Sequence, residues 1–152
     1  MENSKTVSVL NNLLQITNDR LEGFREVDKE MIPNYSNLSA EYDHLVMQST
    51  KMRTELSCLI GEMGGNPDDS PTIAGGLHRT WIDLKNAFTF DKDEATLESV
   101  LFGENAAIKT YEDALKSGDL SPDSINLINN QLQDLKASYK KFASFEKNSD
   151  LE

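Results

Sequence analysis

The sequence is poor in residues that break helices or cross-link chains. Its 152 residues include only 4 prolines, 8 glycines and 1 cysteine. Long stretches are rich in Leu, Glu, Lys, Asn and Ala, a composition that favours helix although Asn is a weak helix former. The lone Cys58 excludes an internal disulfide and suits a reducing compartment, so we expect a cytoplasmic location.

Basic residues and long apolar runs are also scarce. Lys and Arg total 15 against 26 Asp and Glu, which gives a formal net charge of -11. Such a surface repels phosphate backbones and anionic lipid heads, so we expect neither nucleic acid nor a membrane as partner. No apolar run approaches the roughly 20 residues of a membrane span. The first residues, Met1 to Val9, lack the basic start and apolar block of an export signal.

The apolar residues that are present recur about every 3.5 residues in four segments, as on the inward seams of packed helices. We predict helices over about 5–31, 36–63, 92–117 and 121–147, in one domain spanning 1–152. Pro33, Gly64-Gly65 and Gly118 supply stop signals, and Ser121-Pro122 is a favoured helix start. The seams consist of Val7, Leu10, Leu14, Thr17, Leu21 and Phe24; Leu38, Tyr42, Leu45, Ser49, Met52, Leu56, Leu59 and Met63; Leu97, Leu101, Glu104, Ile108, Tyr111 and Leu115; and Ile125, Ile128, Leu132, Leu135, Tyr139 and Phe142.

The connection from Asn66 to Asp91 is far longer than the few residues that join antiparallel neighbours in a bundle. Leu77, Trp81, Leu84 and Phe88 recur in it at helical spacing, which predicts a short crossover helix over about 73–88. Such a link lets the second and third long helices run parallel. The predicted fold is therefore all-α, a ferritin-like four-helix bundle with a short helix in the crossover, and a plain up-and-down bundle is the alternative.

Glu104 is the one carboxylate in the middle of a predicted seam, between Leu101 and Ile108. A buried carboxylate stays charged only if a cation, a metal or hydrogen bonds stabilise it. Three interpretations of Glu104 follow. It hydrogen-bonds a tyrosine in a polar core cluster, it reaches solvent at a widened seam, or it is a functional carboxylate that binds a metal such as iron or manganese. The other polar side chains proposed for this cluster are Tyr42, Ser49, Tyr111 and Tyr139.

A ferritin-type di-iron site needs one Glu on each of two helices and a Glu-x-x-His pair on each of the other two. Glu41 and His44 have this spacing, yet the seam positions of Tyr42 and Leu45 turn His44 outwards. Glu22 is a further candidate ligand, although it points mainly away from the seam. The fourth helix contains no histidine, so the six-ligand set is incomplete.

Catalytic residues are not apparent. Cys58 has no recognisable sequence relation to His44 or His78, the two histidines of the chain, and no glycine-rich phosphate loop follows a strand. On the predicted crossover helix we expect Trp81 to be a packing residue. We expect His78 to be partly buried and hydrogen-bonded to a neighbouring backbone group or carboxylate, rather than a metal ligand or an acid-base group. We therefore assign no catalytic residue.

Several short words spread over nearly the whole chain resemble a known family. They are Leu10-Asn11-Asn12-Leu13-Leu14, Asp19, Gly23-Phe24, Glu55-Leu56, Gly64-Gly65, Gly76-Leu77-His78-Arg79, Trp81, Asp83-Leu84-Lys85, Gly103-Glu104 and Tyr111. Together they resemble a bacterial ferritin-like four-helix-bundle family known chiefly as a domain of unknown function, and the block from Gly76 to Lys85 is the most specific part.

The resemblance implies a ferritin-like topology, a bacterial cytoplasmic origin and Glu104 as a metal-site carboxylate. Members of that family often place a histidine in the last helix about where Tyr139 stands here, which weakens a di-iron assignment. Two hypotheses follow. One is a non-enzymatic binding or structural protein, with a stress-related role and acting through its surface or as a homodimer. The other is an iron- or manganese-binding oxidase or storage protein that uses Glu104.

Overall fold

Four long α-helices make up the computed structural model, which describes residues 2–31, 36–68 and 93–150. They are α1 (Glu2–Met31), α2 (Ser36–Glu62), α4 (Asp93–Lys116) and α5 (Pro122–Asp150). These ranges contain no strand. The predicted all-α class and the four helices are confirmed. The last helix continues beyond the predicted end at 147.

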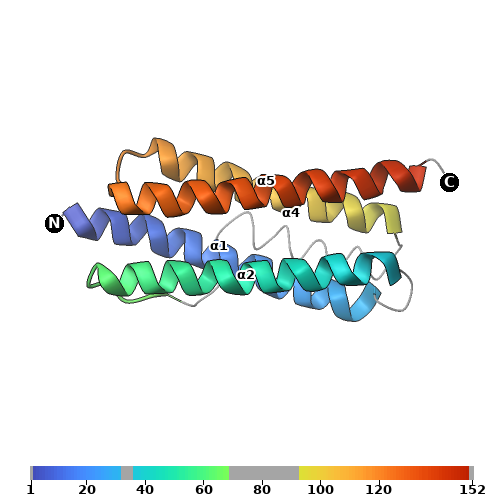
Figure 1. Ribbon diagram of the computed structural model, residues 1–152, viewed down its shortest axis with the longest axis horizontal. Helices are drawn as coiled ribbons and strands as arrows, with labels where there is room; N and C mark the ends of the chain where they lie inside the picture. Colours follow the sequence, from blue (N-terminus) through green and yellow to red (C-terminus); the bar gives the residue numbers. More distant parts are fainter. Residues whose placement is uncertain (1, 32–35, 69–92, 151–152) are drawn as a thin grey trace.

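The helices form two antiparallel hairpins that lie side by side (Figure 1). α1 packs mainly on α2, and α4 packs mainly on α5. Figure 1 also shows α2 and α4 running in the same direction, from the end of the bundle far from the N-terminus toward the near end. The predicted crossover helix over 73–88, with His78 and Trp81, lies outside the described residues.

Glycine and serine define the ends of three helices. After α2, Gly64 adopts a left-handed φ of 80°, and the Gly65 N–H donates to the Ile60 carbonyl over 2.9 Å. After α4, Gly118 has a φ of 77°. Glycine adopts these angles without the steric cost that a Cβ would impose. At the start of α5, the Ser121 hydroxyl accepts a hydrogen bond from the Ser124 backbone N–H at 3.3 Å, as an N-cap does.

The core follows the predicted seams closely. Its main cluster consists of Leu10, Leu13, Leu14, Met52, Leu56, Ile60, Ile108, Tyr111, Ala114, Ile128, Leu132 and Leu135. Burying one such aliphatic side chain contributes about 1.5 to 3 kcal/mol. This apolar cluster joins the two hairpins, and all four helices also carry polar side chains into the core.

One seam position was predicted wrongly. Ile125 is 37% exposed, because Ser124, four residues before Ile128, takes the inward position at the start of α5 and is completely buried. Leu59 is half-buried and packs against the main cluster, beside the completely buried Ile60. A straight helix turns every 3.6 residues, so a seam extrapolated at 3.5 residues drifts from the true inward face.

Candidate functional site

A band of polar side chains crosses the middle of the bundle, and every helix contributes to it. We call it the central polar band. Its members are Thr17, Arg20, Gln48, Ser49, Glu104, Tyr111, Gln131 and Ser138; all are buried except Gln48, which is half-buried. Since a polar group loses hydration when it is buried, each needs a partner inside the protein.

An ion pair between Arg20 of α1 and Glu104 of α4 forms the centre of the band. The Arg20 Nε–H donates to Glu104 Oε1 over 2.6 Å, and Nη2 donates to Oε2 over 2.9 Å. Each residue is only 1% exposed. Both oxygens of Glu104 therefore accept from one planar guanidinium, the bidentate arrangement that makes such pairs strong and directional.

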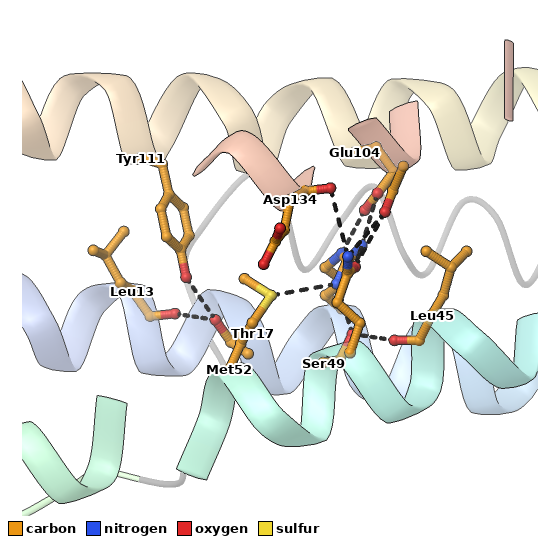
Figure 2. A network of polar contacts seen from close by, with 11 residues as sticks. Leu13, Thr17, Leu45, Ser49, Met52, Glu104, Tyr111 and Asp134 are labelled. Atoms are coloured by element: carbon orange, nitrogen blue, oxygen red, sulfur yellow. Dashed lines mark hydrogen bonds and ion pairs between the residues drawn. The ribbon is translucent and has the colours of Figure 1, made fainter. Parts of the chain in front are cut away.

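The rest of the guanidinium is also bound. Nη1 donates to Ser49 Oγ over 2.8 Å and lies 3.7 Å from Met52 Sδ, while Nη2 donates to Gln48 Oε1 over 2.7 Å. The Phe24 ring lies against the cation, with its centroid 5.0 Å from Cζ. Figure 2 shows Glu104 of α4 facing Ser49 of α2 across the core. Arg20 thus ties α1 to both α2 and α4.

A second set of bonds surrounds Tyr111, about one turn of α1 away. The Tyr111 hydroxyl donates to Gln131 Oε1 over 2.7 Å. It also lies 3.2 Å from Thr17 Oγ1, a contact that Figure 2 shows. Gln131 Nε2 in turn donates to the Met52 carbonyl over 3.2 Å and to Glu55 Oε1 over 3.3 Å. These bonds connect all four helices. Thr17 belongs to α1, Met52 to α2, Tyr111 to α4 and Gln131 to α5.

Burial controls the protonation of Tyr111. Complete burial raises the pKa of the Tyr111 phenol far above its ordinary value, and the hydrogen bond with Thr17 and the charge of Arg20 oppose this only in part. The phenol is therefore neutral and serves as a hydrogen-bond donor at any pH near neutrality.

The structure brings together only some of the residues proposed from the sequence. Glu104, Ser49 and Tyr111 belong to the central polar band, while Tyr139 is half-buried and packs against the apolar core. Glu22 and His44 are exposed on α1 and α2. The side chains of Glu41 and Tyr42 lie outside the described part of the structure. Within that part, no three His, Cys, Asp or Glu side chains are grouped so that they could hold a metal ion.

His44 borders a shallow groove between α2 and α5. The groove has a volume of about 180 Å³, and Gln48, Asp134, Ser138 and Lys141 also line it. Gln48 links this surface to the band: its amide nitrogen donates to Ser138 Oγ over 3.0 Å, while its oxygen accepts from Arg20. Gln48 therefore both lines the groove and contacts the buried guanidinium.

Sequence reasoning missed Arg20, Gln48, Gln131 and Ser138. For Arg20 a signal existed, because it follows Thr17 by three residues and precedes Phe24 by four, which is seam spacing. The predicted seam passed from Thr17 to Leu21 instead, the apolar neighbour of Arg20. Gln131 and Ser138 each precede a seam residue by one position, and nothing in the sequence distinguishes them from exposed neighbours.

Together these features define an all-α four-helix bundle whose centre is a hydrogen-bonded polar band built on an ion pair. In the described part of the chain, no helix is both long and apolar enough for a membrane span. A family model described as "Domain of unknown function (DUF2383)" matches residues 5–117, and the chain belongs to this family. The match includes Arg20, Ser49, Glu104 and Tyr111, but α5 lies beyond it. No curated protein and no solved structure matches the chain.

Proposed function

We propose that this protein is a non-enzymatic, ferritin-like bundle that acts as a binding or structural protein and needs no metal in its core. The observation that carries this proposal is the engagement of both Glu104 oxygens by the Arg20 guanidinium. A carboxylate held in this way has its charge balanced within the chain. Both oxygens already accept from a fixed cation, which disfavours their use as a base or a metal ligand.

The described surroundings of Glu104 do not suit an iron or manganese ion. A metal bound there would lie beside the fixed positive charge of Arg20, and in a buried site that repulsion is only weakly screened. Glu22 and His44, the other candidate ligands whose side chains are described, are exposed. This disagreement between the donor set and the metalloprotein hypothesis favours the metal-free alternative.

The test is a metal analysis of the intact protein. Protein incubated anaerobically with iron(II) or manganese(II), then desalted, should retain much less than one equivalent by elemental analysis. Glu104→Ala should retain no less than the wild type. Stoichiometric metal in the wild type that is lost in Glu104→Ala would overturn the proposal and establish the metalloprotein alternative.

The ferritin-like part of the proposal is supported by the parallel course of α2 and α4 (Figure 1). In an up-and-down bundle those two helices would run in opposite directions. A bacterial cytoplasmic protein acting in a stress response, through its surface or as a homodimer, remains the role we propose. Sedimentation equilibrium tests the self-association: a dimer supports it, and a monomer at the highest soluble concentration would leave only the surface role.

A further inference from the structure

The groups around the Arg20 side chain supply an acceptor for each N–H donor of its guanidinium. An arginine carries five N–H groups and no acceptor. Nε–H pairs with Glu104, the Nη1 protons face Ser49 Oγ and Met52 Sδ, and the Nη2 protons face Gln48 and Glu104. Every donor of this cation therefore has an acceptor, although the side chain is almost completely shielded from water.

The acceptors are held in place by bonds of their own. Ser49 Oγ donates to the Leu45 carbonyl over 2.8 Å, which turns its lone pairs toward Arg20. The Gln48 amide nitrogen donates to Ser138, which turns its oxygen toward the same cation. Phe24 covers one face of the guanidinium, an arrangement that stabilises a desolvated cation.

We infer that the centre of the bundle is a binding site for a guanidinium group, and that Arg20 is its built-in ligand. The site combines a bidentate carboxylate, oriented neutral acceptors and an aromatic face, which together select a planar cation over a spherical one. If the ligand is removed and the acceptors remain, the same site accepts a free guanidinium ion. Gln48, between the cation and the α2/α5 groove, marks the route of entry.

The test is rescue of Arg20→Ala by guanidinium. Thermal unfolding of this variant is followed by circular dichroism with up to about 20 mM guanidinium chloride, at ionic strength held constant with sodium chloride. Because a ligand that binds only the folded state stabilises it, Tm should rise saturably by about 3 to 7 °C. Urea, which has a similar shape and no charge, should give no rise.

Two control proteins and the helix content of Arg20→Ala make the outcome decisive. Wild type and Arg20→Ala/Glu104→Gln should show no rise, because one site is already filled and the other has lost its carboxylate. If Arg20→Ala is unfolded alone, helix should return as guanidinium is added. No gain in Tm or helix beyond that of the double variant would overturn the inference.

Nitrogen-15 NMR of the wild type gives a second readout that depends on no variant. The Arg20 Nη–H signals should be resolved and slow to exchange, as expected for a fixed guanidinium. Signals averaged by rapid rotation and exchange would also overturn the inference. Neither experiment involves a metal, so a failure of the proposed function and a failure of this inference are distinguishable.

Discussion

At the scale of single residues, Arg20 and Glu104 present a conflict between desolvation and pairing. Removing two charges from water costs several kcal/mol for each ion, and their attraction offsets this only when the geometry and further hydrogen bonds are good. The bidentate contact and the bonds to Gln48 and Ser49 meet that condition. The pair should therefore be costly to break from one side and much less costly to replace as a whole.

We predict that Arg20→Met destabilises the protein by about 3 to 5 kcal/mol, since it leaves Glu104 buried without a cation. Arg20→Met/Glu104→Leu should recover most of this loss. Urea unfolding monitored by circular dichroism measures both free energies.

The matched control is the surface pair of Lys136 and Glu112, with 3.6 Å between nitrogen and oxygen and side chains that are 42% and 43% exposed. Because water screens such a pair, Lys136→Met should cost less than about 1 kcal/mol. An Arg20→Met loss no larger than that of Lys136→Met would show that the ion pair is not buried as described.

The raised pKa of Tyr111 predicts that the protein loses stability at alkaline pH. Its pKa is raised in the folded state, so above the ordinary tyrosine value of about 10 the unfolded chain loses a proton that the folded chain keeps. The stability from this group is fully present below that pH. Above it, stability should fall by up to about 1.4 kcal/mol per pH unit.

Comparison with Tyr111→Phe isolates this effect from those of other titrating groups. The wild type should lose more stability than the variant between pH 9 and 11 in urea titrations, because phenylalanine has no proton to lose. The variant should be less stable at neutral pH, since Gln131 then lacks its donor. Parallel pH profiles for the two proteins would contradict the assigned cause.

At the scale of elements, the sequence was most informative about the helices and least about their polar contacts. Periodic Leu, Ile and Met residues predicted the inward faces, and Gly64 and Gly118 the ends of α2 and α4. Gln48 could not be placed, because its burial depends on Ser138, 90 residues away in the chain. Hydrophobic periodicity carries information about one helix at a time, whereas the partners of a buried polar group lie on other helices.

Just after the end of α2, the chain packs tightly against α1 at Gly65. A Cβ at this position would lie 2.6 Å from Val7 Cγ1 and 2.9 Å from Cγ2. We therefore predict that Gly65→Ala destabilises the protein by about 1 to 3 kcal/mol through overpacking. Thermal or urea unfolding measures the loss.

Gly61 provides the matched control. It lies in the last turn of α2, and a Cβ there meets nothing within 4 Å. Gly61→Ala should therefore be neutral or stabilising by up to about 1 kcal/mol. In a protein that already carries Val7→Ala, the Gly65→Ala substitution should cost less free energy of unfolding than it does in the wild type. Strictly additive losses would argue against the contact.

At the scale of the whole molecule, the net charge of -11 opposes folding, because the folded chain brings its surface carboxylates closer together. The buried pair is neutral as a unit and is shielded from mobile ions. Surface repulsion and the central ion pair should therefore respond differently to salt. The Debye length falls from about 30 Å at 0.01 M salt to about 3 Å at 1 M.

We predict that Tm rises by several degrees between about 10 mM and about 500 mM sodium chloride. In Asp43→Asn/Asp113→Asn, which replaces two exposed carboxylates, Tm at low salt should be higher and the gain with salt smaller. The cost of Arg20→Met should change little across the same range, because screening barely reaches a buried pair. If that cost fell with salt as steeply as the surface term, water and ions would have access to the centre of the bundle, and the closed polar band described here would be wrong.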